Sequence, residues 1–273
     1  MRTDFFRHKS VLITGASAGI GEELAWQLAN AGATLTLTAR RRDLLDRLAA
    51  RITSAGHVPP VVVDGDVTSD ADLQRAVKAG VERWGRLDVV IANAGFAVVG
   101  ELRDLSLADY QRQLDVNLFG VLRTIYAALP EIEKAKGNVV IIGSVAGWIA
   151  SPGASAYAMS KFALRALATS LAVELRHVGV TVTLISPGFI VSSIRQVDNQ
   201  DHLRASARDW IPAWIVVPTD KAVRQMLGAV ARGDREAIIT GHGKLLVALE
   251  RWAPWVVRAL SRRVRRPGPT PSR

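Results

Sequence analysis

The residues best suited to proton transfer are Tyr157 and Lys161, which stand four positions apart in the run Tyr-Ala-Met-Ser-Lys. They open a helix-like stretch that runs to about His177, and at 3.6 residues per turn both side chains share one helix face. An ammonium beside a phenol favours the phenolate and lowers the pKa of the tyrosine from its reference value of about 10. Tyr157 is therefore a candidate general acid, although tyrosine and lysine at this spacing are also common surface neighbours.

A third polar residue, Ser144, follows the apolar run Val139–Ile142 after a single glycine. If that run is a buried strand, the Ser144 hydroxyl lies at the carboxyl edge of the sheet, where open α/β sheets bind their ligands. A serine at such a position is also often a cap. The combination of Ser144, Tyr157 and Lys161 nevertheless favours a catalytic site.

A glycine-rich turn follows the first apolar run and leads directly into a helix-like stretch. It reads Thr14-Gly15-Ala16-Ser17-Ala18-Gly19-Ile20-Gly21. Glycines at such a junction let the backbone turn tightly and bring its N–H groups against a pyrophosphate, and we expect Gly15, Ser17, Gly19, Ile20 and Gly21 to contact a dinucleotide. The alternative is a tight turn without a ligand, since the glycine spacing differs from that of the standard fingerprint.

The second apolar run ends in three arginines, Arg40, Arg41 and Arg42, and the first carboxylate after them is Asp43. A cofactor without a ribose phosphate ordinarily meets an acidic side chain here, whereas a guanidinium can clamp a 2′-phosphate. The sequence therefore favours NADP(H) over NAD(H), with Arg40 as the first expected contact and Arg41 as the second. The alternative is that the arginines are solvated and simply open a helix.

Seven apolar, β-branched runs recur along the chain, and helix-like stretches separate all but the last pair. The runs are Val11–Thr14, Thr34–Thr38, Val61–Val63, Val89–Ala92, Val139–Ile142, Thr181–Ile185 and Ala237–Thr240. Continuous apolar runs imply strands that are buried on both faces. The sequence predicts one doubly wound α/β domain over residues 1–243, with a parallel seven-stranded sheet and helices on both faces.

The composition supports a large folded domain, because 49% of the 273 residues are hydrophobic and 22% are charged. The absence of cysteine excludes disulfides, thiolate metal sites and a cysteine nucleophile, and it fits a cytoplasmic protein. We expect no metal at the site. The first strand begins after ten mostly polar residues, so no signal peptide is expected.

Seven short motifs resemble, in order and spacing, those of the short-chain dehydrogenase/reductase family. They are Thr14–Gly21, Asp66-Val67, Ala92-Asn93-Ala94-Gly95, Asn117, Ser144, the Tyr157/Lys161 pair and Pro187-Gly188. The resemblance covers residues 8–241, and it implies a Rossmann-like fold, a nicotinamide cofactor and a homodimer or homotetramer.

The resemblance also implies residue roles. Tyr157 would donate the proton to a carbonyl oxygen, Ser144 would hold that oxygen, Lys161 would support Tyr157 and bind the ribose, and Asn117 would hold a water molecule in a proton relay. The cofactor would be lined by Asp66 and Val67 at the adenine, by Asn93, Ala94 and Gly95 after the fourth strand, and by Pro187, Gly188 and Ile190 at the nicotinamide. The chain departs from the family pattern at Ala18, where many NADP-using members carry a basic residue, and at Ala92, which we expect to be harmless.

Two regions lie outside the simple alternation. Residues 189–217 form a long apolar connection after the sixth strand, which predicts an apolar substrate wall, with Trp210 and Trp214 equally suited to core or dimer contacts. Residues 244–273 form a basic tail. Seven arginines and no carboxylate fall within 251–273, and subtracting them from the net charge of +10 leaves +3 for the rest.

The tail admits more than one interpretation. Val256, Val257, Leu260 and Val264 form a helical stripe among arginines, so that residues 244–266 suit contact with an anionic membrane. The alternative, which the sequence slightly favours, is packing on the protein itself or on a second subunit. Nucleic acid is a poor candidate because only Trp252 and Trp255 offer stacking surfaces.

Together these features predict an NADP(H)-dependent oxidoreductase that interconverts a carbonyl and a secondary alcohol. The expected substrate is apolar, of the fatty-acyl, sphingoid, steroid or terpenoid kind, and the location is cytoplasmic or membrane-associated. Two alternatives remain: a nucleotide-binding regulatory or scaffold protein without turnover, and a reductase of small polar carbonyls.

Overall fold

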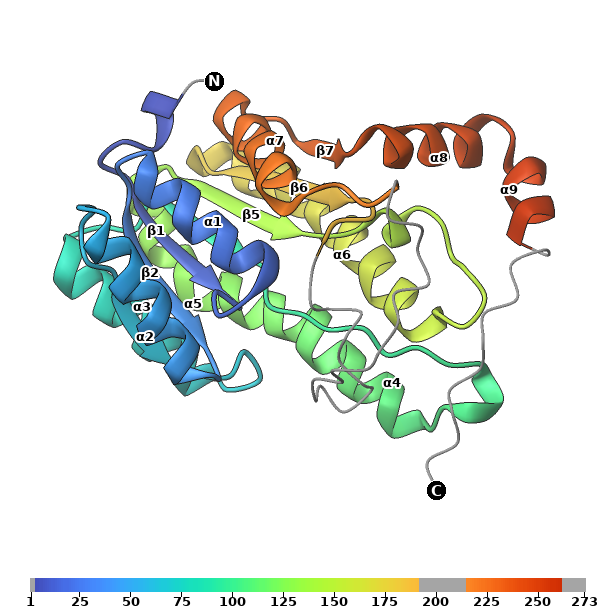
Figure 1. The fold of residues 1–273 in the computed structure, drawn as a ribbon, viewed down its shortest axis with the longest axis horizontal. Helices are drawn as coiled ribbons and strands as arrows, with labels where there is room; N and C mark the ends of the chain where they lie inside the picture. Colours follow the sequence, from blue (N-terminus) through green and yellow to red (C-terminus); the bar gives the residue numbers. More distant parts are fainter. Residues whose placement is uncertain (1–2, 192–214, 262–273) are drawn as a thin grey trace.

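Seven parallel strands form one continuous sheet at the centre of the molecule (Figure 1). The computed structural model describes residues 3–191 and 215–261. The strands are β1 (Ser10–Thr14), β2 (Thr34–Ala39), β3 (Val61–Asp64), β4 (Val89–Ala92), β5 (Asn138–Ile142), β6 (Thr181–Pro187) and β7 (Glu236–Ile239), in the order β3-β2-β1-β4-β5-β6-β7. The order reverses at β1, which pairs with β2 on one side and β4 on the other, and this confirms the predicted doubly wound sheet.

Helices cover both faces of the sheet. They are α1 (Gly19–Asn30), α2 (Arg42–Ser54), α3 (Asp70–Trp84), α4 (Leu107–Leu114), α5 (Gly120–Ala135), α6 (Ser155–Glu174), α7 (Thr219–Arg232), α8 (Gly241–Trp252) and α9 (Pro254–Ser261). Successive β1 residues alternate between two cores: Val11 and Ile13 pack with α1, α2 and α7, whereas Leu12 packs with α3, α5 and α6. This alternation explains the continuous apolar runs, since the inner strands of the sheet are buried on both faces.

One expectation about the end of the sheet was wrong. The sequence showed no helix-like stretch between the last two strands, whereas α7 connects β6 to β7. Its buried residues Val223, Met226, Leu227 and Val230 recur at helical spacing, and the helix is capped at its C-terminus by Gly233, whose φ of 72° is left-handed. Every two strands that are consecutive in the sequence are therefore connected through at least one helix.

The C-terminal region packs in part against its own chain. Helix α8 begins at Gly241, three residues before the predicted start of the tail, and α8 contacts both β7 and α9. Val247 and Val257 are buried, and α9 ends at Ser261, so Val264 of the predicted stripe lies outside the described residues. Among the described helices, none has the length and hydropathy needed to span a membrane.

Candidate active site

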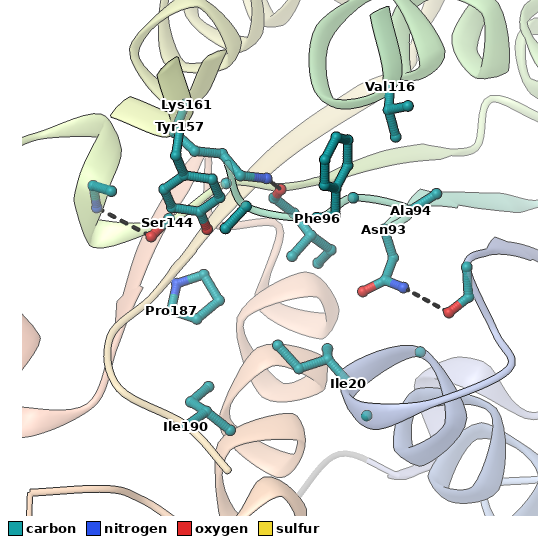
Figure 2. Close-up of a pocket in the computed structure, with 18 of the residues that line it drawn as sticks. Ile20, Asn93, Ala94, Phe96, Val116, Ser144, Tyr157, Lys161, Pro187 and Ile190 are labelled. Carbon is teal, nitrogen blue, oxygen red and sulfur yellow. Dashed lines mark hydrogen bonds between the residues drawn. The ribbon is translucent and has the colours of Figure 1, made fainter. Parts of the chain in front are cut away.

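One cleft of about 550 Å³ runs along the carboxyl ends of the central strands. It is lined by every predicted site residue except Asn117, from Gly15, Ser17, Gly19, Ile20 and Gly21 through Arg40, Arg41, Asp66, Val67, Asn93, Ala94 and Gly95 to Ser144, Tyr157, Lys161, Pro187, Gly188 and Ile190. Figure 2 shows this cleft, with Ile20 and Asn93 on one side and Tyr157, Ser144 and Pro187 on the other. The topology thus brings two groups of residues that are far apart in the sequence into one cavity.

The glycine-rich turn is tightly held against the start of the loop after β4. Gly15 has a left-handed φ of 66°, and a Cβ there would lie 2.7 Å from Ala94 Cα. A Cβ at Gly21 would overlap the carbonyl oxygen of Gly15. The Asn93 side-chain amide donates to Thr14 O at 3.0 Å and to Gly15 O at 3.1 Å, so Asn93 braces the turn (Figure 2). The cradle offers bare backbone and the N-terminus of α1 to a ligand, which fits a pyrophosphate.

The three arginines after β2 differ in what their side chains contact. Arg42 turns away into ion pairs with Asp46 at 2.8 Å and Asp64 at 3.5 Å, and these partners raise the pKa of its guanidinium. Arg40 and Arg41 line the cleft instead, and Arg41 Nη2 donates to Ser17 Oγ of the glycine-rich turn at 3.2 Å. The strand end therefore presents two cations where an NAD-type site would place a carboxylate.

The predicted catalytic residues come from two elements that touch closely. Ser144 follows β5, where its Oγ accepts a hydrogen bond from Ala146 N at 3.0 Å, and Tyr157 lies in the first turn of α6. Between them, Gly147 packs on α6 so closely that a Cβ would lie 2.7 Å from Lys161 O. Figure 2 shows the Tyr157 ring and Ser144 at the same end of the cleft. The contact at Gly147 fixes the distance between the two hydroxyl-bearing elements.

Lys161 is buried beneath Tyr157. Its side chain is embedded at 5% exposure, and its Nζ lies 5.7 Å from the centre of the Tyr157 ring. Nζ donates to the carbonyl oxygen of Ile142 at 2.9 Å, at the end of β5. Desolvation lowers the pKa of Lys161 from 10.5 to about 8. Lys161 therefore loses its charge at a lower pH than a solvated lysine does, next to a candidate acid.

Asn117 is the predicted residue that does not line the cleft. It is fully buried in a π-helical turn, Asp115–Phe119, between α4 and α5. Its Oδ1 accepts from Phe96 N at 3.1 Å, and its Nδ2 donates to Phe96 O at 2.9 Å and lies 3.4 Å from Ser160 Oγ. The geometry shows a side chain that holds the segment after Gly95, while a role in holding water stays a prediction.

Several residues of the cleft were not among the predicted site residues, and those from the two C-terminal helices are of particular interest. His242, Leu246 and Val257 line it from α8 and α9. His242 follows β7 closely, so the carboxyl-edge argument that identified Ser144 would also have found it. The predicted substrate loop is described only at its ends, where Phe189 and Ile190 line the cleft; its residues Ile194, Leu203, Trp210, Ile211 and Trp214 lie outside the described residues.

Comparisons with known proteins agree with this geometry. The family model for short chain dehydrogenase matches residues 9–203. The chain is 36% identical over 226 residues to an 11-beta-hydroxysteroid dehydrogenase-like protein 4A of Arabidopsis thaliana, covering 82% of this chain and 74% of the relative. It is 40% identical over 199 residues to oxidoreductase UcpA of Salmonella typhimurium, covering 71% and 75%.

A solved structure is also similar. It is an alcohol dehydrogenase from the archaeon Thermococcus sibiricus complexed with 5-hydroxy-NADP, and it matches with a TM-score of 0.73 at 28% identity, over 84% of this chain and 95% of that chain. The shared fold, the family match and the assembled serine, tyrosine and lysine lead to one conclusion. The chain belongs to the short-chain dehydrogenase/reductase family of nucleotide-binding oxidoreductases.

Proposed function

We propose that this protein is an NADP(H)-dependent oxidoreductase that interconverts a carbonyl group and a secondary alcohol on an apolar substrate. The observation that carries the proposal is the single cleft that joins an arginine-bearing nucleotide cradle to Ser144, Tyr157 and Lys161. Family membership supports the oxidoreductase chemistry. The choice of NADP(H) and the apolar substrate class go beyond family membership and are argued from the residues of the cleft.

Each catalytic side chain has a distinct task at the substrate oxygen. When bound, the nicotinamide supplies or accepts the hydride. During reduction the Ser144 hydroxyl donates a hydrogen bond to the carbonyl oxygen, and Tyr157 transfers its phenolic proton to that oxygen as negative charge develops. The Lys161 ammonium stabilises the phenolate that remains, and the buried site increases this effect because little water screens it.

The proposed preference for NADP(H) over NAD(H) rests on the arginines at the end of β2. A 2′-phosphate carries negative charge and suits the paired donors of a guanidinium, and both Arg40 and Arg41 line the cleft. The similar archaeal alcohol dehydrogenase is a complex with an NADP derivative, which supports this preference. Because Ala18 offers no charge, phosphate binding would depend on these two arginines.

Charge removal tests the cofactor preference. We expect Arg40→Ala together with Arg41→Ala to weaken NADPH binding at least about a hundredfold while changing NADH binding less than about threefold, since each charge-assisted contact contributes about 1.5–3 kcal/mol. Arg42→Ala is the matched control, because Arg42 pairs with Asp46 and Asp64. Equal losses for both cofactors would reject a 2′-phosphate site.

The apolar-substrate part rests on the remaining lining. Phe96, Val116, Ile149, Leu246 and Val257 are apolar members of the wall. The charged lining residues among those described are Arg40, Arg41 and Asp66 at the ends of β2 and β3, and Lys161 below Tyr157. Substrates bearing carboxylate or phosphate groups would therefore meet only one cation, Lys161, among the described residues at the catalytic end.

The test is NADPH oxidation with carbonyl compounds graded in chain length. The proposal predicts that kcat/KM rises with apolar length, because each added methylene that is buried contributes about 0.8 kcal/mol. A flat or falling series would favour the alternative reductase of small polar carbonyls. Binding of NADPH without reduction of any carbonyl would favour the regulatory or scaffold alternative.

We also propose two kinds of partner. One is a second copy of the chain, in a homodimer or homotetramer, as is general in the family. The other is the surface of an anionic membrane, supported by Trp252 and Trp255, which are 80% and 72% exposed beside Arg251 and Arg258, and by the arginine-rich sequence that follows. A cytoplasmic location stays a prediction.

A further inference from the structure

The turn after β7 holds an unusual backbone that brings His242 over the end of β6. Thr240 has a φ of 86°, in the left-handed region that a β-branched residue rarely adopts. Its Oγ1 accepts from Gly243 N at 3.2 Å and so caps α8. Strain of this kind persists only where the surrounding structure enforces it, and its effect here is to place the first turn of α8 against Gly188.

The His242 imidazole acts as an acceptor toward the segment that follows β6. Phe189 N donates to His242 Nε2 at 3.0 Å, and Thr240 Oγ1 lies 3.1 Å from the same nitrogen. A backbone amide can only donate, so Nε2 carries no proton and the ring is neutral with its proton on Nδ1. Burial favours this neutral form, because it lowers the pKa of His242.

The contact is close on every side of the segment. The Phe189 ring stacks on the His242 ring, with centroids 5.5 Å apart and planes inclined by 17°. A Cβ at Gly188 would lie 2.6 Å from His242 Nε2. On the opposite side, Val217 N donates to Phe189 O at 2.9 Å. Residues 187–190 are thus fixed between His242 and Val217.

We propose that His242 is a positioning residue for the nicotinamide end of the cleft. Through Nε2 it holds Phe189, and with it Pro187, Gly188 and Ile190, in the conformation that accepts the cofactor. This inference rests on the proposed function, because Pro187, Gly188 and Ile190 are the residues expected at the nicotinamide. It adds a link between α8, which lies beyond the residues matched by the family model, and the cofactor site.

The experiment compares two substitutions of different kinds at His242. His242→Phe keeps a flat ring for stacking on Phe189 but removes the acceptor, whereas His242→Gln keeps an acceptor at a similar reach. NADPH dissociation constants are measured by calorimetry without substrate. We expect His242→Phe to raise the NADPH dissociation constant about tenfold and His242→Gln to raise it less than about threefold.

Steady-state kinetics and a control variant separate positioning from folding. For His242→Phe, the KM for NADPH should rise while kcat at saturating cofactor stays within about twofold of wild type. His57→Phe is the matched control, since His57 lies edge-on to Trp26 and does not line the cleft. Equal weakening by His242→Phe and His242→Gln, or unchanged NADPH binding in both, would overturn the proposal.

Nitrogen NMR of the His242 imidazole in wild-type protein without cofactor gives a readout that does not depend on whether the variants fold. The proposal predicts the neutral tautomer of His242 with its proton on Nδ1. A proton on Nε2 at neutral pH would overturn the proposal, because Phe189 N would have no acceptor. If wild-type protein failed to bind NADPH while the tautomer was as predicted, the cofactor assignment would fail and the contact between His242 and Phe189 would stand.

Discussion

Lys161 combines a buried position with a charge that the proposed proton transfer needs. Its pKa of about 8 in the fold is below the 10.5 of an unfolded lysine, so between these values the unfolded chain binds one proton more. Stability therefore increases as pH rises through this window, by up to about 3 kcal/mol from this residue. Below the window the buried charge costs stability.

Comparing wild type with Lys161→Met isolates this contribution. We expect the free energy of unfolding of wild type to increase relative to that of Lys161→Met as pH is raised from 7 to 10, because only wild type loses the buried charge. Urea denaturation at several pH values gives the measurement. A difference between the two proteins that is constant over this range would show that Lys161 has no depressed pKa.

Single residues also show where sequence reasoning succeeds and where it stops. The shared face of Tyr157 and Lys161 could be predicted, because helical periodicity depends only on local spacing. The anchoring of Phe96 by Asn117 could not, since it depends on a π-helical turn and on a loop more than twenty positions away. Likewise, the hydrogen bond between Phe189 and His242 joins residues 53 positions apart.

At the scale of elements, the junction between β1 and α1 leaves little room for substitution. We expect Gly21→Ala to destabilise the protein by about 2 kcal/mol or more and to abolish NADPH binding, because the added methyl overlaps Gly15 O in the cradle. Chemical denaturation and NADPH titration measure the two effects.

Gly228→Ala is the matched control within α7. A Cβ at Gly228 would meet its nearest neighbour, Arg232 Nη1, at 3.4 Å, which is an ordinary contact. This change should stabilise the helix by about 0.5–1 kcal/mol and leave NADPH binding unchanged. If Gly21→Ala behaved like Gly228→Ala, the tight contact described for the glycine-rich turn would be wrong.

The elements themselves were largely predictable, because each strand is an unbroken apolar run between two layers of helices. The structure extends β6 to Pro187 and begins α1 at Gly19, within a few residues of the expected limits. Helix α7 was missed because charged and polar residues interrupt its apolar positions. Its buried face became evident only once the sheet it covers was in place.

At the scale of the whole molecule, α8 and α9 connect the cleft with the exterior. Leu246 and Val257 face the cleft, whereas Trp252 and Trp255 are exposed on the same two helices. If this surface meets a membrane, vesicles containing phosphatidylserine should bind the full chain. We expect the double change Trp252→Ser and Trp255→Ser to weaken this binding at least about tenfold.

Tyr126→Ser serves as the control in this vesicle experiment, since Tyr126 is 71% exposed on α5. Vesicles without anionic lipid should bind wild type weakly. The phosphatidylserine vesicles should also bind it weakly at high salt, because the arginines supply long-range attraction that salt screens. Equal binding by all variants would instead indicate that the exposed tryptophans contact protein, as in a subunit interface.

The central claim is that Tyr157 transfers a proton in a site that binds NADPH, and one comparison tests it most directly. NADPH binding and the oxidation of NADPH by an apolar ketone are measured for wild type and for Tyr157→Phe. The account predicts similar NADPH binding by both proteins and a fall in turnover of about a thousandfold in the variant. Turnover that survives in Tyr157→Phe, or a wild type that binds NADPH and reduces nothing, would contradict it.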